Sequence, residues 1–192
     1  MQMGNRLWIC PSWTPPPEPD AINLLLDPGL AFGTGTHPTT AMCLRALDAA
    51  SLEGACIVDY GCGSGILGIA AALLGARQVL GVDNDPQAIT ASHDNAKRNE
   101  VPPAQFSAHL HAASELEAWQ GSADWVVANI LAGPLIELGP VLTSLMAPKG
   151  RLLLAGLLEE QAEQIIAAYA PEVTLAVADQ MEEWVLLAGQ RC

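Results

Sequence analysis

The sequence is poor in charged and in aromatic side chains. Charged residues make up 15% of its 192 residues and aromatic residues 5%, whereas hydrophobic residues make up 51%. A disordered chain has the opposite balance, with much charge and little to bury. The composition therefore excludes a largely disordered protein and indicates one well-buried domain, since the chain is too short for two ordinary domains.

Basic residues are scarce. The chain has 8 Lys and Arg against 21 Asp and Glu, which gives a formal net charge of −13. Direct nucleic-acid binding requires clustered Lys and Arg, and the sequence contains no such cluster. We therefore expect no direct nucleic-acid partner. The charge is compatible with a basic substrate such as a lysine-rich protein, although many acidic proteins carry such a charge only for solubility.

The sequence also lacks cysteine spacings that are typical of metal sites, and it lacks long apolar runs. The five cysteines include no C-x-x-C pair, so we expect no metal site and a reducing compartment. The N-terminus lacks the apolar region of a signal peptide. No uninterrupted apolar run reaches the roughly 18 to 20 residues that a membrane span needs. From these observations we expect a cytoplasmic protein with no membrane association, and a monomer.

Strand and helix patterns alternate through most of the chain. Short apolar runs predict strands, and periodic apolar patterns predict helices between them. We interpret residues 1–27 as a proline-rich, irregular arm or linker remnant with a strand at 22–27, and residues 28–192 as the catalytic domain. The predicted helices cover 37–50, 65–76, 86–99, 134–146 (bent at Gly139 and Pro140) and 158–170. The predicted strands cover 55–60, 78–83, 105–111, 123–130, 150–157, 172–179 and 182–189.

This alternation predicts an α/β fold, a doubly wound and mostly parallel sheet with helices on both faces. The last two predicted strands have no helix between them, so they should form an antiparallel C-terminal hairpin. In open parallel sheets, ligands bind beyond the carboxyl ends of the strands, near the point where the strand order reverses.

A glycine cluster lies at such a strand end. In "VDYGCGSG" (58–65), Gly61, Gly63 and Gly65 follow a predicted strand and open a helix. Glycines there permit a tight turn and a close approach of the backbone to a ligand. The dinucleotide fingerprint needs its third glycine at position 66, which is Ile66. The pattern by itself is weak evidence for a nucleoside cofactor.

Two residues, Asp83 and Asn129, strengthen it, and a third, Asp59, lies beside the glycines. Asp83 ends the next strand, where a carboxylate accepts hydrogen bonds from ribose hydroxyls; the alternative is a helix-capping role, for which Asp85 is better placed. Asp59, just before the glycines, is expected to support the loop rather than contact the ligand. Asn129 ends the strand at 123–130 and should face the place where cofactor and substrate meet; the alternative is a turn residue that caps a helix.

Taken together, "LDPGLAFGTGTHPTTAMCL", "VDYGCGSGILGIAA", "VDNDPQAITASHDNAKRN" and "VVANILAGPL" closely resemble the bacterial ribosomal protein L11 methyltransferase family, PrmA. The resemblance covers nearly the whole chain. It implies a Rossmann-like methyltransferase fold and S-adenosylmethionine as cofactor. It also implies methylation of lysine or N-terminal amines of ribosomal protein L11. Enzymes of this family carry an additional N-terminal domain that captures the substrate, and the resemblance implies that this chain lacks it.

The family's cofactor contacts, carried over by position, are Thr40, Gly61, Asp83 and Asn129. With Gly63 from the glycine cluster, these are the predicted cofactor-binding residues, and Asn129 is also the predicted catalytic residue. The stretch "AFGTGTHPTT" (31–40) is expected to lie over the cofactor. Phe32 within it could contact the cofactor or belong to the core.

No dedicated general base stands out. His37 is in a plausible place, but a helix-capping role beside Pro38 explains it equally well. His93, His109 and His111 read as surface or strand residues without partners. Three alternatives stay open: a methyltransferase for another protein or a small molecule, a nicotinamide-dependent oxidoreductase, and a non-catalytic binding module.

Overall fold

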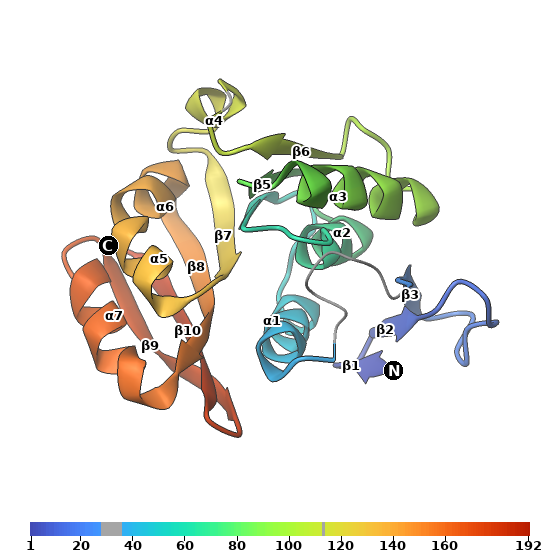
Figure 1. Cartoon of the computed structure of the whole chain (residues 1–192), viewed down its shortest axis with the longest axis horizontal. Coiled ribbons are helices and arrows are strands. Elements are labelled where there is room, and N and C mark those ends of the chain that lie inside the picture. The colour runs from blue at the N-terminus through green and yellow to red at the C-terminus, as the bar shows by residue number, and fades with distance from the viewer. Residues whose placement is uncertain (28–35, 113) are drawn as a thin grey trace.

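The computed structural model describes residues 1–27, 36–112 and 114–192, which fold around one large twisted sheet (Figure 1). In these residues the sheet has seven strands in the order β6-β5-β4-β7-β8-β10-β9. The strands are β4 (Cys56–Tyr60), β5 (Gln78–Asp83), β6 (Phe106–Leu110), β7 (Ala123–Asn129), β8 (Met146–Leu158), β9 (Val173–Met181) and β10 (Trp184–Arg191).

The strand directions confirm the predicted topology. β4 pairs in parallel with β5 and β7, β5 with β6, and β7 with β8. β9 and β10 form the predicted antiparallel C-terminal hairpin. β10 lies between β8 and β9 and runs antiparallel to both, so β9 is the edge strand. The order reverses between β4 and β7, which places their carboxyl ends at the position where such sheets bind ligands.

Helices cover both faces of the sheet. The helices are α1 (Pro38–Ala49), α2 (Ile66–Leu73), α3 (Pro86–Arg98), α4 (Glu115–Ala118), α5 (Ala132–Glu137), α6 (Gly139–Leu145) and α7 (Ala162–Tyr169), with a 3-10 turn at Glu159–Gln161 before α7. One core lies between the sheet and α1, α2 and α3. A second core lies between the other face and α4, α5, α6 and α7. Successive residues of the strands, such as Ile57 and Val58, enter opposite cores.

Two helices begin as their sequences predict. The His37 side chain accepts a hydrogen bond from the Thr39 N–H at the start of α1, and Pro38 occupies the first helical turn. The Asp85 side chain accepts one from the Gln87 N–H at the start of α3. A proline in the first turn loses no intrahelical hydrogen bond, because that N–H has no acceptor there. Asp85 is thus the helix cap, as the sequence predicted.

The region 134–146 forms two helices rather than one bent helix. α5 ends at Glu137 and α6 starts at Gly139, with Pro140 in the first turn of α6. The proline ring and its missing N–H prevent the continuous hydrogen-bond ladder that one helix would need. The predicted disturbance at Gly139 and Pro140 is confirmed, and it is stronger than a bend.

The prediction of an irregular arm is wrong for part of residues 1–27. β1 (Gln2–Met3), β2 (Leu7–Cys10) and β3 (Ile22–Leu25) form a small sheet in the order β1-β2-β3. Its turn is held by Asp48 of α1, which is 4% exposed and accepts hydrogen bonds from the backbone N–H groups of Asn5 (2.6 Å) and Arg6 (3.1 Å). This long-range contact leaves no periodic signal in the sequence. The strand predicted at 22–27 is present over 22–25.

Across the described ranges 1–27, 36–112 and 114–192, no helix has both the length and the apolar character needed to cross a membrane.

Candidate functional site

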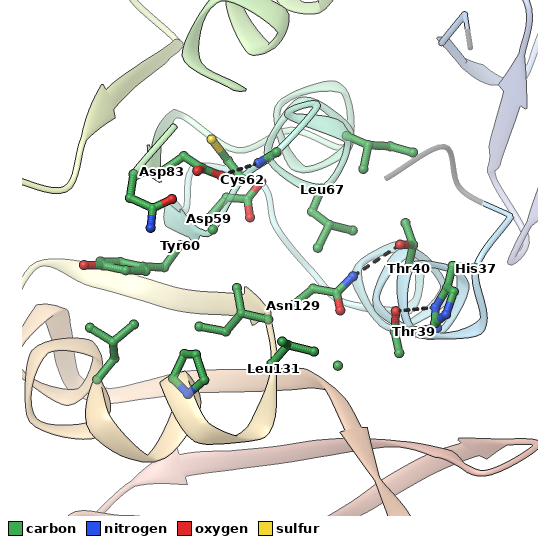
Figure 2. Close-up of a pocket in the computed structure, with 18 of the residues that line it drawn as sticks. His37, Thr39, Thr40, Asp59, Tyr60, Cys62, Leu67, Asp83, Asn129 and Leu131 are labelled. Atoms are coloured by element: carbon green, nitrogen blue, oxygen red, sulfur yellow. Dashed lines mark hydrogen bonds between the residues drawn. The ribbon is translucent and has the colours of Figure 1, made fainter. Parts of the chain in front are cut away.

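A cavity of about 700 Å³ opens at the carboxyl ends of β4, β5 and β7 (Figure 2). Its volume falls within the range of small-molecule and cofactor sites. The predicted residues Thr40, Gly61, Gly63, Asp83 and Asn129 all line it. Ile130 and Leu131, which follow Asn129, line it too. So do residues that the sequence did not assign to the site: Tyr60, Leu67, Asn84, His111, Pro134, Leu138, Gly156 and Trp184.

The glycine loop between β4 and α2 presents its backbone to this cavity. Gly61, Gly63 and Gly65 have φ angles of 79°, 54° and 82°, a region that side chains with a Cβ rarely adopt. Gly65 caps α2, and a Cβ there would crowd Ser92 of α3. The Gly61 N–H donates to the Val82 carbonyl at 2.7 Å, which ties the loop to the end of β5. The sequence therefore needs glycine here for geometry as well as for ligand approach.

Asp83 stands at the end of β5 with its carboxylate fixed by two backbone N–H groups. Oδ2 accepts a hydrogen bond from the Gly63 N–H at 2.9 Å, and Oδ1 accepts one from the Asp85 N–H at 3.0 Å. Each carboxylate oxygen has a further lone pair for a ligand hydroxyl. The helix-capping alternative for Asp83 does not apply, because Asp85 fills that role.

Asp59 lies beneath the loop and is 1% exposed. Its Oδ2 accepts a hydrogen bond from the Gly68 N–H of α2 at 2.9 Å, which agrees with the supporting role expected for it. Burial raises the pKa of this carboxyl to about 7, the Gly68 hydrogen bond acts in the opposite direction, and the nearby charge of Asp83 raises it further.

Cys62 offers no nucleophile to the cavity. It is 5% exposed and its Sγ lies 3.5 Å from the Ser92 hydroxyl. Burial raises the pKa of this thiol, and the negative charges of Asp59 and Asp83 act in the same direction. Because the thiolate is the reactive form of cysteine, Cys62 is an inert packing residue at neutral pH.

Asn129 and Thr40 are 89 residues apart in the chain and are in direct contact in the wall of the cavity. Asn129 is the last residue of β7, and Thr40, with 0% exposure, lies in the first turn of α1. The Asn129 Nδ2 donates a hydrogen bond to the Thr40 Oγ1 at 3.2 Å (Figure 2). The alternative role of Asn129 as a helix cap is not found, because Leu131 occupies the cap position of α5.

The turn after Asn129 is held between two glycines. The Ile130 side chain lies where a Cβ on Gly61 would stand, and the Ile130 backbone lies where a Cβ on Gly156 would stand. Gly156 is in β8 with a φ of 92°. The Asn129 turn is therefore in direct contact with both the glycine loop and β8. Gly156 was not predicted, because an isolated glycine inside an apolar strand carries no sign of its distant neighbour.

His37 caps α1. Its Nδ1 accepts a hydrogen bond from the Thr39 N–H at 3.3 Å and lies 2.8 Å from the Thr39 hydroxyl. The ring packs edge-on against Trp184 from β10, with ring centroids 5.0 Å apart. The helix-capping interpretation of His37 is thus the one that the structure supports. Trp184 reaches the site only because β10 lies inside the sheet, an arrangement that no local pattern reveals.

The other histidines need a correction. His93 was expected to lack a partner, yet its Nε2 accepts a hydrogen bond from the Ala108 N–H at 3.1 Å. His109 lies 3.6 Å from the Glu115 carboxylate. His111 lines the cavity, and its backbone N–H donates to the Asp83 carbonyl at 3.0 Å. Within the described ranges, no three His, Cys, Asp or Glu side chains are grouped so as to hold a metal ion.

Half of the stretch "AFGTGTHPTT" falls outside the described residues. Positions 31–35, with Phe32, belong to the part of the chain about which the structure says nothing. Of the stretch, His37, Thr39 and Thr40 line the cavity. The expected position of this stretch over the cofactor stays a prediction, and so do both interpretations of Phe32, as a cofactor contact or as a core residue.

The residues around the cavity fit a nucleoside cofactor with a charged amino-acid tail. Asp83 offers fixed carboxylate oxygens to ribose hydroxyls, and the glycine loop allows close backbone approach. On the far side, the first turn of α1 offers the backbone N–H of Thr40, because Pro38 has no N–H and His37 accepts that of Thr39, and an N–H at a helix start suits a carboxylate. Asn129 lies between these two regions, at the strand end where a reacting group would be located (Figure 2).

Comparisons with known proteins agree with this geometry. Residues 1–192 match the family described as ribosomal protein L11 methyltransferase (PrmA). A curated protein of that name from Pseudomonas aeruginosa (strain LESB58) is 56% identical over 191 residues, which is 100% of this chain and 64% of the relative. The chain thus spans about two thirds of the length of the curated relatives it matches.

Solved structures share the fold. Ribosomal protein L11 methylase from Lactobacillus delbrueckii subsp. bulgaricus is 34% identical with a TM-score of 0.85, over 100% of this chain and 97% of that one. An RNA methyltransferase from Salinibacter ruber, solved with S-adenosyl-L-homocysteine, is 19% identical with a TM-score of 0.58, over 78% of this chain and 89% of that one; this likeness concerns the fold alone. The predicted methyltransferase fold is confirmed. The chain belongs to the ribosomal protein L11 methyltransferase (PrmA) family, and this membership indicates S-adenosylmethionine as its methyl donor.

Proposed function

We propose that this protein transfers methyl groups from S-adenosylmethionine to lysine or N-terminal amines of ribosomal protein L11. The observation that carries the proposal is the position of Asn129. It faces the same cavity as the glycine loop and Asp83, so that an amine held by Asn129 meets the donor held by the other residues. The names of the relatives supply the substrate.

In this proposal the cofactor is held by the residues predicted from the sequence. Asp83 accepts hydrogen bonds from the ribose hydroxyls, and Gly61 and Gly63 bring the loop backbone close to the ligand. The backbone N–H of Thr40 faces the carboxylate of the cofactor's amino-acid tail. Asn129 closes the site on the side of the reacting group. Asp59 supports α2 from below, as its hydrogen bond to Gly68 indicates.

When bound, S-adenosylmethionine supplies a methyl group on a positively charged sulfur: the amine lone pair forms the new C–N bond, and the pair of the broken C–S bond stays on sulfur. The protein has to orient a neutral amine toward that methyl group. The Asn129 carboxamide can accept an amine N–H through Oδ1 and so direct the lone pair. The methylated nitrogen, now an ammonium, loses its proton to water.

The rim of the cavity is apolar. Leu131, which is 69% exposed, lines it together with the apolar side chains of Ile130, Leu138 and Trp184. Such a rim suits the four methylene groups of a lysine side chain and excludes water from the amine. An uncharged lysine is stabilised by these surroundings, because desolvation disfavours the ammonium form.

The function is tested in two stages. Calorimetry with S-adenosylhomocysteine and with NAD measures which nucleoside cofactor binds; we expect binding of the first only. The chain is then incubated with S-adenosylmethionine and purified ribosomal protein L11, and mass spectrometry counts added methyl groups. NAD binding without a response to S-adenosylhomocysteine would return the protein to the oxidoreductase class. Cofactor binding with transfer only to another protein or a small molecule would reassign the substrate.

A cytoplasmic location and a monomeric state belong to the same proposal. The substrate named by the relatives is a ribosomal protein, which supports the first. Sedimentation analysis of the purified chain measures the second. The predicted absence of a nucleic-acid partner rests on the low content of Lys and Arg and is checked by a DNA and RNA binding assay.

A further inference from the structure

Thr40 presents two different groups to the site. Its backbone N–H belongs to the first turn of α1, where the helix geometry leaves donors without intrahelical acceptors. Pro38 has no N–H, and His37 takes that of Thr39. The side-chain hydroxyl, in contrast, is the acceptor for the Asn129 Nδ2 at 3.2 Å. The backbone and the side chain of one residue therefore serve different purposes.

The hydroxyl contact decides which end of the Asn129 carboxamide faces the cavity. The rotation of an asparagine carboxamide about χ2 is broad, so the side chain does not choose an orientation by itself. Nδ2 is directed to the Thr40 hydroxyl, as Figure 2 shows, which leaves the carbonyl Oδ1 as the end of the carboxamide available to a ligand. Thr40 is fully buried and comes from a rigid helix, so its hydroxyl is a fixed reference point.

We propose that Thr40 is a positioning residue for methyl transfer: its hydroxyl holds the Asn129 carboxamide so that Oδ1, and not the NH₂ group, meets the target amine. This inference rests on the proposed function. It separates the side chain of Thr40 from cofactor binding, which is left to the backbone N–H of the same residue.

The orientation matters because the two ends of the carboxamide have opposite effects on an amine. Oδ1 accepts an amine N–H and leaves the nitrogen lone pair directed at the methyl group. The NH₂ group would instead donate a hydrogen bond to that lone pair and occupy the electrons needed for the C–N bond. A carboxamide that is free to rotate spends part of its time in the unproductive orientation, so turnover falls while cofactor binding is unchanged.

The test uses Thr40→Val, which keeps the shape and the backbone N–H and removes the hydroxyl. Turnover on ribosomal protein L11 is measured at saturating cofactor, and the dissociation constant for S-adenosylhomocysteine is measured by calorimetry. We expect kcat to fall about 5- to 10-fold, the effect of one lost hydrogen bond, and the dissociation constant to change less than about twofold. Thr40→Ser, which restores a hydroxyl, should recover most of the lost turnover.

A double-mutant cycle makes the test specific. In an Asn129→Ala background, Thr40→Val should lower kcat less than about twofold further, because the group that it positions is gone. Thr143→Val is the matched control: Thr143 is also buried, and its hydroxyl donates to the Gly139 carbonyl at 2.9 Å, but it does not line the cavity. That variant tests whether losing any buried threonine hydroxyl lowers turnover.

Several results would overturn the positioning role of Thr40. Equal losses of turnover and cofactor affinity in Thr40→Val would show that the hydroxyl binds the cofactor. An unchanged kcat, or a full additional loss in the Asn129→Ala background, would also overturn the inference. Should Thr40→Val fail to fold by thermal melting, Thr40→Ala is measured in its place, with the same comparison to Thr40→Ser. If the unmodified chain binds cofactor but transfers no methyl group to ribosomal protein L11, the proposed function fails first, and the role of Thr40 on this substrate falls with it.

Discussion

The Asp83 carboxylate joins two segments that are twenty residues apart: it accepts a hydrogen bond from the Gly63 N–H at 2.9 Å and so ties the end of β5 to the glycine loop. The same carboxylate also accepts from the Asp85 N–H at 3.0 Å. The residue that we propose as the ribose ligand is thus also the residue that fixes the loop beside it.

Replacement of Asp83 should therefore weaken cofactor binding through two effects at once. In Asp83→Ala, the ribose loses its acceptor and the loop loses its anchor. Hydrogen bonds to a charged group contribute roughly 1.5 to 3 kcal/mol, so we expect the affinity for S-adenosylhomocysteine to fall about tenfold or more by calorimetry. Asp83→Asn keeps one acceptor oxygen and should lose less. An unchanged affinity in folded Asp83→Ala would leave this residue with a purely structural role.

Asn129→Ala should lower turnover more than it lowers cofactor affinity. The side chain is expected to orient the amine as well as to contact the donor, and only the second contribution appears in a binding measurement. We expect kcat to fall roughly tenfold, the loss of an oriented hydrogen bond. Asn84→Ala is the comparison, because Asn84 lines the cavity beside Asp83 and should affect affinity alone. Parallel losses of kcat and affinity in Asn129→Ala would mean that this residue only holds the cofactor.

Gly156→Ala should be considerably more destabilising than Gly121→Ala. Both glycines have positive φ angles, 92° and 67°, so both variants carry the same kind of backbone strain, about 1 to 2 kcal/mol. A Cβ at Gly121 meets nothing within 4 Å, whereas one at Gly156 overlaps the Ile130 backbone. We expect the Gly156 variant to lose about 1 to 3 kcal/mol more, as in overpacked cores. Urea unfolding of the two variants measures the difference, and equal losses would show that the Ile130 contact is easily relieved.

The Asp59 carboxyl should make the free energy of unfolding decrease as the pH rises from about 4 to about 7. Its pKa in the folded state is raised to about 7, above the value of 3.8 for an exposed carboxyl. Between these values the folded protein holds a proton that the unfolded chain has released, so raising the pH favours unfolding. Below and above this window the contribution is constant.

Asp59→Asn tests this pH dependence directly. The carboxamide oxygen can still accept from the Gly68 N–H, but the side chain has no charge to bury. The difference in free energy of unfolding, variant minus unmodified protein, should increase by on the order of a few kcal/mol when the pH is raised from 5 to 8. Denaturant unfolding at both pH values gives this number. A difference between the two proteins that is independent of pH would show that Asp59 is already ionised at pH 5.

The sequence alone determined the elements and the chemistry that depends on neighbouring residues. Continuous apolar runs specified β4, β5 and β7, and Pro86 with Asp85 specified where α3 begins, because strand burial and helix capping are local effects. The glycines before α2, the carboxylate at the end of β5 and Asn129 indicated a nucleoside site, and the resemblance to the PrmA family implied the cofactor and its contacts. These signals are read from residues that lie close together in the chain.

The tertiary structure decided which residues meet across the sheet. Asp48 holding the turn at Asn5, Trp184 packing against His37, and Gly156 admitting the Ile130 backbone all join segments more than 20 residues apart. No periodicity encodes such pairs, because they depend on strand order and on the direction in which each side chain leaves its own element. The hydrogen bond between Asn129 and Thr40 is of the same kind: the sequence supplied both residues, and only the packing of α1 against the end of β7 turned the Asn129 carboxamide toward Thr40.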